Sequence, residues 1–188
     1  MKIIKFYTIL FFGILFASCS QQQQARKPIS HRSGTFIKES INRNKELLAL
    51  EKKQIDSIIK ADSLHNYIAS SKGYWYKYLV KVNENLPVAK SGDIASFEFE
   101  IKTLNGNIIY TKEELRPQTY VVDKQNIMMG LRDGIKLMKK GETVTFLFPS
   151  YMAFGYHGDN DEIGTNQPLM CTVTLNNLQP ETSQKSEN

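Results

Sequence analysis

Residues 127–155 read IMMGLRDGIKLMKKGETVTFLFPSYMAFG, and this stretch decides the fold. Its first part predicts a helix around Ile127 to Met138, which ends at Gly141. The next part, Glu142 to Phe148, predicts a strand, and Pro149 ends it because proline cannot donate a hydrogen bond to a sheet. The last eight residues, FPSYMAFG, hold three aromatic residues but no acid, histidine or lysine. A site built here must therefore work without an acid–base pair.

The segments around this stretch show the period-two pattern of strands. Apolar and polar residues alternate in IASFEFEIK, residues 94–102, and aromatic and β-branched residues fill YWYKYLVKV, residues 74–82. Asn105-Gly106 lies between IASFEFEIK and NIIYT and predicts a hairpin whose two turn residues both have positive φ. Further strands are expected at Thr119 to Val122 and at Leu169 to Leu178. We therefore expect an α+β domain, in which one internal helix covers the apolar face of an antiparallel sheet.

Residues 35–70 have helical spacing instead. Ile41, Leu48, Ile55 and Ile59 recur at steps of seven, seven and four, with charged residues between them and no proline or glycine. One interpretation is one or two helices that cover the main domain. The other is a helical arm for dimerisation or for docking a partner, although the repeat is too short and irregular for a coiled coil.

The N-terminal residues 1–18 have the pattern of a secretory signal peptide. Lys2 and Lys5 precede an apolar run from Phe6 to Ala17, which is shorter than the roughly 20 residues that span a bilayer as a helix. The run ends in small residues directly before Cys19, which is similar to a bacterial lipobox, where the cysteine carries the lipid. The alternative is an ordinary signal peptide with a chance cysteine. We expect a protein anchored to a membrane through Cys19 and not spanning it.

Two polar segments flank the structured part. The sequence after Cys19, SQQQQARKPISHRSG, has few apolar residues, so residues 19–34 are expected to form a flexible tether. Residues 180–188 are expected to form a disordered tail. The formal net charge is +5, without a concentrated basic patch, which argues against nucleic-acid binding. If Cys19 carries a lipid, Cys171 has no partner for an internal disulfide.

The sequence contains no motif for several common kinds of binding and catalytic site. His31, His65 and His157 are scattered, and no paired cysteines offer a metal site, so we expect no metal and no cofactor. The acids of GDNDEIG, residues 158–164, lack the order of a calcium loop and are expected to be solvated. Ser150 has no GxSxG motif around it.

One reaction needs only an apolar pocket. Rotation about an X–Pro peptide bond crosses a barrier of about 18–20 kcal/mol because the amide must lose its resonance. The twisted transition state has less charge separation than the planar amide, so a dry apolar pocket favours the transition state without a nucleophile or a base.

Three segments of the sequence resemble the FK506-binding-protein family of peptidyl-prolyl isomerases in order and spacing. They are AKSGDIASFEFEIKTLNGNII, the stretch quoted at the start, and IGTNQPLMCTVTLNNL. The resemblance runs from about Ser71 to Gln179, so residues 71–179 are expected to form the isomerase domain. It implies a curved antiparallel sheet wrapped on a short helix. The preceding lipobox, tether and helical extension are similar to those of lipoprotein isomerases associated with gliding motility.

The family's pocket can be transferred to this sequence one position at a time. The resemblance implies these catalytic residues: Phe99, Ile109, Tyr110, Phe154 and Ile163. It implies these substrate-binding residues: Ile127, Met128, Leu131 and Cys171.

Several of these positions depart from the family pattern. Phe99 and Phe154 stand where the family has tyrosines, and Tyr110 stands where it has an aspartate. Aliphatic Ile109 and Leu131 replace rings. The pocket therefore stays apolar but loses hydroxyls and a carboxylate. For each residue the alternative role is core packing, and that alternative has most weight for Cys171, which replaces a phenylalanine on the last strand.

The sequence thus predicts an isomerase that helps exported envelope proteins fold. If the similarity to gliding-associated lipoprotein isomerases holds, these clients belong to the gliding-motility machinery. Its partners are proline-containing polypeptides, with macrolide inhibitors and self-association through the helical arm as further expectations. The rival interpretation is a catalytically weak chaperone or scaffold of the same fold. We expect a lipid anchor in the bacterial cell envelope, at the outer membrane and facing the periplasm.

Overall fold

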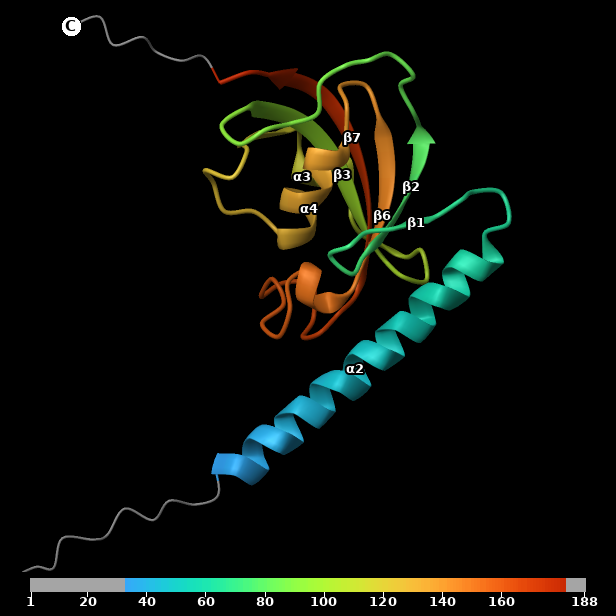
Figure 1. Ribbon diagram of the computed structural model, residues 1–188, viewed down its shortest axis with the longest axis vertical. Coiled ribbons are helices and arrows are strands. Elements are labelled where there is room, and N and C mark those ends of the chain that lie inside the picture. The colour runs from blue at the N-terminus through green and yellow to red at the C-terminus, as the bar shows by residue number, and fades with distance from the viewer. Residues whose placement is uncertain (1–32, 182–188) are drawn as a thin grey trace, which may run out of the picture. The chain divides into compact units, whose positions relative to one another are not determined.

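The computed structural model describes residues 33–181, and it contains an N-terminal helix followed by an open antiparallel sheet (Figure 1). The predicted α+β class is confirmed. The sheet has seven strands in the order β1-β2-β6-β7-β3-β4, and β5 also pairs with β3. The strands are β1 (Ile68–Ala69), β2 (Trp75–Val80), β3 (Ile94–Thr103), β4 (Ile108–Tyr110), β5 (Gln118–Val121), β6 (Thr143–Phe148) and β7 (Leu169–Gln179). The signal peptide, Cys19 and most of the tether and tail lie outside the described residues.

The alternation of side chains along β3 and β7 builds the core. Ala95, Phe97 and Ile101 of β3 are buried on one face, and the same holds for alternate residues of β7 from Leu169 to Leu175. On the opposite face, Thr143 bonds Thr174 and Thr145 bonds Thr172 through their hydroxyls. The period-two pattern therefore divides an apolar concave side, which holds the helix α4 (Figure 1), from an outer side that carries these threonines and, at Leu147, an apolar contact with α2.

The internal helix is shorter than expected. α4 spans Met129–Gly134 and continues as a 3-10 turn, η1 (Ile135–Leu137), so Ile127 and Met128 precede the helix and do not belong to it. Gly130 lies so close to Phe148 that an added Cβ would meet the Phe148 ring at 2.5 Å. The glycines lower helix propensity but let α4 approach the aromatic residues of β6. The periodicity of the sequence does not indicate that α4 must approach Phe148 so closely.

The hairpin between β3 and β4 forms at the expected place but with a different turn. Only Gly106 has a positive φ, of 90°, whereas Asn105 does not. The amide of Thr103 donates to Asn107 O at 2.8 Å, and the Gly106 amide donates to Thr103 O at 3.0 Å. This is the geometry of a longer hairpin loop with a single left-handed residue. The prediction that both turn residues have positive φ was wrong.

A short strand and a short helix are among the elements that were not predicted. One is the strand β1. The other is α3 (Lys112–Leu115), which begins with a capping box between Thr111 and Glu114. The Thr111 side chain accepts from the Glu114 amide, and the Glu114 carboxylate accepts from the Thr111 amide.

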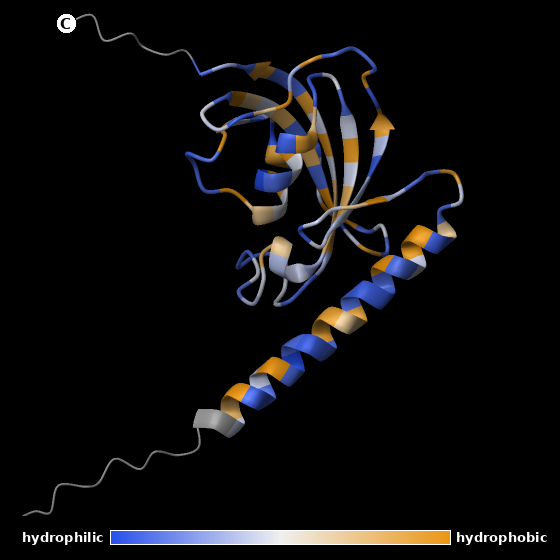
Figure 2. Cartoon of the chain, viewed as in Figure 1, coloured by the Kyte–Doolittle hydropathy of each residue, from blue (hydrophilic) through white to orange (hydrophobic). Residues whose placement is uncertain are grey.

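The N-terminal extension is one helix, α2 (Ser33–Ala61), in which polar and apolar residues alternate along the length (Figure 2). The chain divides into two units between Ser40 and Ile41. In the first unit, Phe36 and Ile37 are exposed. In the second unit, Ile55 is fully buried in a small cluster with Leu104 and Leu147, so the later part of α2 is a docked element of the domain. Within residues 33–181, no helix has the length and apolarity to cross a membrane.

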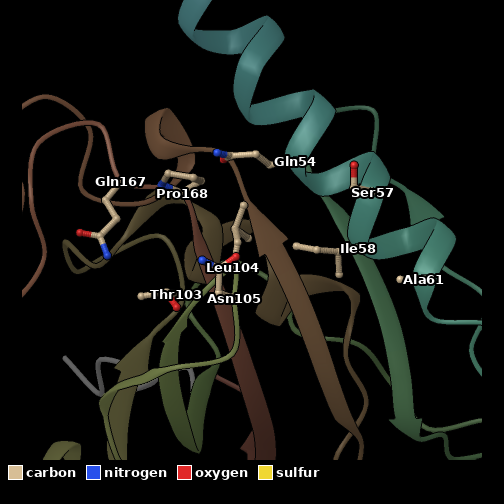
Figure 3. A pocket seen from close by; sticks show the side chains of 9 residues that line it. All are labelled: Gln54, Ser57, Ile58, Ala61, Thr103, Leu104, Asn105, Gln167 and Pro168. Carbon is tan, nitrogen blue, oxygen red and sulfur yellow. The ribbon is translucent and has the colours of Figure 1, made fainter.

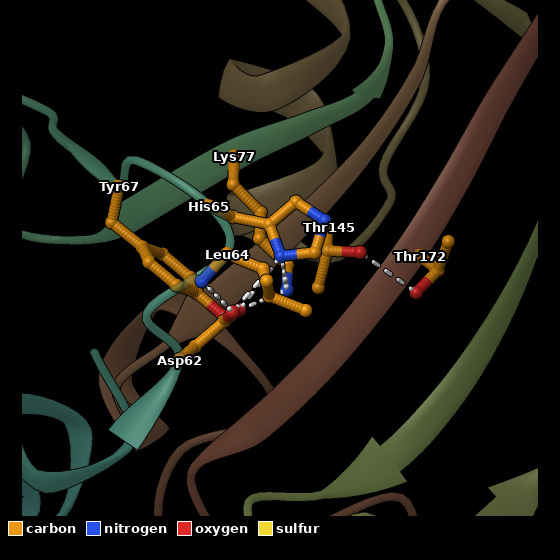
Figure 4. Close-up of polar contacts among 7 residues, drawn as sticks. All are labelled: Asp62, Leu64, His65, Tyr67, Lys77, Thr145 and Thr172. Carbon is orange, nitrogen blue, oxygen red and sulfur yellow. Dashed lines mark hydrogen bonds and ion pairs between the residues drawn. The ribbon is translucent and has the colours of Figure 1, made fainter. Parts of the chain in front are cut away.

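A polar cluster secures the end of α2 (Figure 4). Asp62 follows the helix and accepts hydrogen bonds from His65 Nδ1 at 2.9 Å and from Tyr67 Oη at 3.3 Å. It also forms an ion pair with Lys77 of β2. The hydrogen bond from Lys77, and next that from His65, hold the pKa of Asp62 well below its usual value. The cluster therefore ties the connection after α2 to the sheet.

Candidate functional site

A cavity of about 360 Å³ opens between β3, β5, the start of α4 and the loop after β6. We call it the aromatic cavity, because five of its lining residues carry rings. Its lining consists of Phe97, Phe99, Ile101, Tyr110, Leu115, Gln118, Thr119, Tyr120, Ile127, Met128, Leu131, Phe154 and Asp159. Six of the nine site residues suggested by the resemblance lie here: Phe99, Tyr110, Ile127, Met128, Leu131 and Phe154.

Regular secondary structure positions one wall and the floor of the aromatic cavity. Phe97, Phe99 and Ile101 share one face of β3 because side chains on a strand repeat every second residue. The rings of Phe97 and Phe99 have centroids 5.5 Å apart, which is an ordinary separation for an attractive aromatic pair. Leu131 of α4 is 3 % exposed. Phe97 and Ile101 were missed, although their spacing from Phe99 could have identified them.

Phe154 reaches the cavity from the loop of residues 149–168. A 3-10 turn, η2 (Ser150–Met152), starts this loop directly after Pro149, which ends β6 as expected. The carbonyl oxygen of Ser150 accepts hydrogen bonds from the amides of Ala153 at 3.0 Å and Gly155 at 2.9 Å. These two residues flank Phe154. The turn therefore fixes the backbone on both sides of the ring that the FPSYMAFG segment contributes.

A carboxylate also reaches the aromatic cavity. Tyr110 Oη donates a hydrogen bond of 2.6 Å to Asp159 Oδ2. Asp159 Oδ1 accepts from the amides of Asp161 at 2.9 Å and Ile163 at 2.8 Å. The expectation that Asp159 is a solvated loop acid was wrong, because it organises the loop and lines the cavity, whereas Asp161 and Glu162 are exposed. An aspartate that accepts from the amide two residues later is a recognisable turn signal.

The Tyr110–Asp159 contact changes the titration of both groups. The hydrogen bond to Asp159, with burial second, raises the pKa of Tyr110 to about 12. Burial alone would raise the pKa of Asp159, but the hydrogen bonds from Tyr110 and from the backbone amides outweigh it and lower that pKa. At neutral pH the pair is a tyrosine hydroxyl that donates to a carboxylate. Asp159 thus supplies the carboxylate that the sequence comparison found missing at position 110.

Three residues suggested by the resemblance lie outside the lining of the aromatic cavity. Ile109 is half-buried against the core. Ile163 is buried in the core, and its carbonyl oxygen accepts from the Asp159 amide at 3.1 Å, so it holds the loop. Cys171 is fully buried on β7, and burial raises the pKa of its thiol. Its surroundings fit the core-packing alternative.

A second cavity, of about 470 Å³, lies between α2, the β3–β4 turn and the end of the 149–168 loop (Figure 3). Uncharged residues, several with amide or hydroxyl groups, line it: Gln54, Ser57, Ile58, Ala61, Thr103, Leu104, Asn105, Gln167 and Pro168. None of them is aromatic. This cavity therefore lacks the rings that make the first one suited to an apolar ring of a ligand.

The chemistry open to the aromatic cavity is limited. Its lining contains one carboxylate and no histidine, lysine or cysteine, so no acid–base pair converges there. Across the described residues, 33–181, no three histidine, cysteine or acidic side chains are grouped so that they could hold a metal ion. The site can bind and desolvate a small apolar group.

Comparisons with known proteins agree with this arrangement. Residues 87–176 match the family model for FKBP-type peptidyl-prolyl cis-trans isomerases. A relative described as a probable FKBP-type peptidyl-prolyl cis-trans isomerase FkpA from Neisseria meningitidis serogroup B is 25 % identical over 138 residues, which cover 72 % of this chain and 49 % of the relative. The chain thus spans about half the length of that relative.

Two solved structures have a similar fold. The crystal structure of FkpA from Escherichia coli superposes with a TM-score of 0.59 at 19 % identity, and the match covers 94 % of this chain and 83 % of FkpA. A peptidyl-prolyl cis-trans isomerase from Pseudomonas syringae pv. tomato gives a TM-score of 0.58 at 17 % identity, over 72 % of this chain and 96 % of the other. Residues 87–176 are therefore similar to FKBP-type peptidyl-prolyl cis-trans isomerases, and the two solved structures show the same fold.

Proposed function

We propose that the protein is a peptidyl-prolyl cis-trans isomerase that acts on X–Pro bonds of polypeptide clients in the aromatic cavity. The observation that carries this proposal is the cavity itself, which has about 360 Å³ and five aromatic residues in its lining, together with one carboxylate already bonded to Tyr110. Apolar walls with a few fixed polar groups are what a small ring such as proline requires.

The physical basis of the activity is differential desolvation. The X–Pro bond isomerises over tens to hundreds of seconds in water, because rotation breaks the resonance of the amide. A planar amide carries more charge separation than the twisted one, so removing water disfavours the ground state more than the transition state. The buried floor at Leu131 and the rings of Phe97 and Phe99 supply an environment of this kind.

In this proposal the ring of Phe154, which comes from the loop after β6 and not from the sheet, covers the bound proline. The alternative function is a catalytically weak binding module or chaperone that holds proline-containing chains. The absence of a hydroxyl on Phe99 and Phe154 favours that alternative, since nothing at these two positions can donate to a client carbonyl.

The deciding experiment is the rate of cis-to-trans conversion of an X–Pro peptide with added protein of residues 20–188. We expect acceleration by the unmutated protein, a large loss in Phe154→Ala, and no loss in the matched control Tyr156→Ala, whose side chain on the same loop is 73 % exposed. No acceleration by the unmutated protein, with retained affinity for the peptide, would leave only the binding function.

We propose further that the isomerase serves exported proteins while anchored through Cys19 to the outer membrane, facing the periplasm. The sequence pattern at residues 1–19 supports this, and the similarity to gliding-associated lipoproteins supports clients in the gliding machinery. Labelling with a radioactive fatty acid tests the anchor, with Cys19→Ser as the unlabelled control. Equal amounts of the protein in the soluble and the membrane fractions would contradict the lipid anchor.

Two binding proposals follow from the family and from α2. FK506 is expected to enter the aromatic cavity, and inhibition of the peptide assay by this macrolide tests that. Self-association is expected through the apolar residues of α2 that are exposed, of which Phe36 is 66 % and Ile41 46 % exposed. Sedimentation velocity tests it, since Ile41→Lys is expected to shift an oligomer to the monomer and the exposed control Lys45→Ala is not.

A further inference from the structure

A buried carboxylate on α2 contacts the loop that carries Phe154. Glu51 is 2 % exposed, and its Oε2 accepts a hydrogen bond of 2.9 Å from the Ser150 amide, across 99 residues of sequence. Its other oxygen, Oε1, is buried and has no partner within the described part of the chain. Glu51 therefore makes a single hydrogen bond to one defined backbone atom.

That backbone atom starts the turn that holds Phe154. Pro149 has no N–H, so Ser150 carries the first amide donor after β6. The carbonyl oxygen of Ser150 in turn accepts from the amides of Ala153 and Gly155 at 3.0 and 2.9 Å. Two successive hydrogen bonds thus connect the Glu51 carboxylate to the residues on either side of Phe154.

The same turn is also held from its other side. Tyr151 Oη donates to the carbonyl oxygen of Gly73 at 3.0 Å and lies 3.2 Å from that of Lys72. At the far end of the loop, the Asn166 amide donates to Gly155 O at 2.8 Å. The position of the turn is therefore set by three neighbours, and of these Glu51 alone belongs to α2.

Apolar packing does not explain a glutamate at position 51. Burying a carboxylate costs free energy that a leucine of similar size would not cost. A leucine would, however, leave the buried Ser150 amide without an acceptor. What the glutamate supplies and the leucine cannot is an acceptor aimed at the Ser150 amide.

We propose that Glu51 is a positioning residue for Phe154, so that the geometry of the proline site depends on α2. This inference rests on the proposed isomerase function and goes beyond it, because it assigns part of the site to a helix outside residues 87–176, which match the family. The residue acts through Ser150 and does not touch the client.

The first test compares Glu51→Leu with Glu51→Gln in the peptide assay. Leucine removes the acceptor, and we expect kcat/KM to fall by about tenfold or more, as displaced site groups typically cause. Glutamine retains an acceptor oxygen, so the wild-type kcat/KM is expected. Glu46→Leu replaces an exposed glutamate on the same helix and serves as the control. A merely structural contact would instead lower the melting temperature and leave kcat/KM of the folded fraction unchanged.

A second pair of variants changes Ser150, which carries the hydrogen-bond donor, and leaves the Glu51 acceptor unchanged. Ser150→Pro replaces the amide hydrogen by a ring carbon at the contact with Glu51, and the backbone is compatible with proline because Pro149 has ψ of 156° and Ser150 opens a 3-10 turn. Ser150→Ala deletes only the hydroxyl. We expect Ser150→Pro to lower kcat/KM as Glu51→Leu does, and Ser150→Ala to leave it unchanged. Full activity in Ser150→Pro would overturn the proposal even if Glu51→Leu did not fold.

A measurement without catalysis separates this proposal from the proposed function. In ¹⁵N-labelled protein, Glu51→Leu is expected to shift the amide signals of Ser150, Ala153 and Gly155 and to speed their hydrogen exchange. If the unmutated protein does not accelerate isomerisation, the proposed function fails, and these shifts still decide whether Glu51 positions the loop. Unchanged signals at Ala153 and Gly155 in a folded variant would refute the positioning role.

Discussion

Tyr110 of β4 donates a 2.6 Å hydrogen bond to Asp159, and this contact joins the sheet edge to the loop that carries Phe154. The two residues stand 49 positions apart in the sequence. Asp159 also accepts two backbone amides of its own loop, so the contact fixes the loop and not only one side chain.

Replacing Tyr110 by phenylalanine keeps the ring in the aromatic cavity and removes this hydrogen bond, together with two longer ones of 3.3 Å, to Asp161 Oδ2 and from the Glu162 amide. We expect kcat/KM for an X–Pro peptide to fall by roughly threefold to tenfold, the range for losing one such bond. Hydrogen exchange of the Asp161 and Ile163 amides is expected to accelerate. The control is Tyr156→Phe, at an exposed ring of the same loop, and equal losses in both variants would contradict the role of the Asp159 contact.

The same pair predicts how the loop responds to pH. Because the folded pKa of Asp159 is lowered, its contribution to stability is present above the ordinary carboxyl value of about 4 and is lost as the pH falls through the folded value. Because the folded pKa of Tyr110 is raised to about 12, its contribution is complete below the ordinary tyrosine value and is lost as the pH rises through about 12. Amide exchange of the loop against pH tests this. Asp159→Asn is expected to abolish the acid limb, and an unchanged acid limb would exclude Asp159 as its source.

The burial of Ile55 predicts how much the docking of α2 contributes to the free energy of unfolding. Its side chain is fully buried against Leu104 and Leu147, so Ile55→Ala is expected to lower the free energy of unfolding by about 2–5 kcal/mol. Trp75, the single tryptophan, belongs to the same cluster, and its fluorescence should shift toward that of a solvated indole. Leu50→Ala, at a side chain that is 61 % exposed on the same helix, should leave both quantities unchanged. A small effect of Ile55→Ala on both would mean that α2 is held by polar contacts alone.

Replacing Gly130 by alanine, a better helix former, is expected to destabilise the protein. Alanine at position 130 would place Cβ 2.5 Å from the Phe148 ring, so the ring or α4 must move. We expect a lower melting temperature for Gly130→Ala, although alanine has the higher helix propensity. Gly164→Ala is the control, because its nearest neighbour, 3.4 Å away, is the flexible end of Gln167. A rise in melting temperature for Gly130→Ala would show that the helix has room to shift.

Local patterns predicted most of the sheet, because alternation along a strand is a property of consecutive residues. β3, β6 and β7 lie within two residues of their expected ends. The length of α4 could not be predicted in the same way, because it depends on the approach of Gly130 to Phe148, which only the folded chain brings together. The number of positive φ angles at Asn105-Gly106 depends on the loop length, which the dipeptide alone does not define.

The site was predictable where it follows a strand or a family motif. Phe99, Phe154 and Leu131 are among the residues that line the aromatic cavity, as the resemblance suggested. The contacts that support the site were not predictable. Asp159 meets Tyr110, and Glu51 meets Ser150, through pairs that are distant in sequence, and no periodicity in either segment indicates its partner.

The place of β7 has a consequence for biosynthesis. This strand, residues 169–179, is the last in the sequence, yet it lies between β6 and β3 in the sheet and pairs Ile94 with Gln179. The two halves of the sheet cannot join until residues 169–179 have been synthesised, since contacts between distant segments form late. Until then β6 and β3 lack their shared neighbour, and their unpaired edges can pair with other chains.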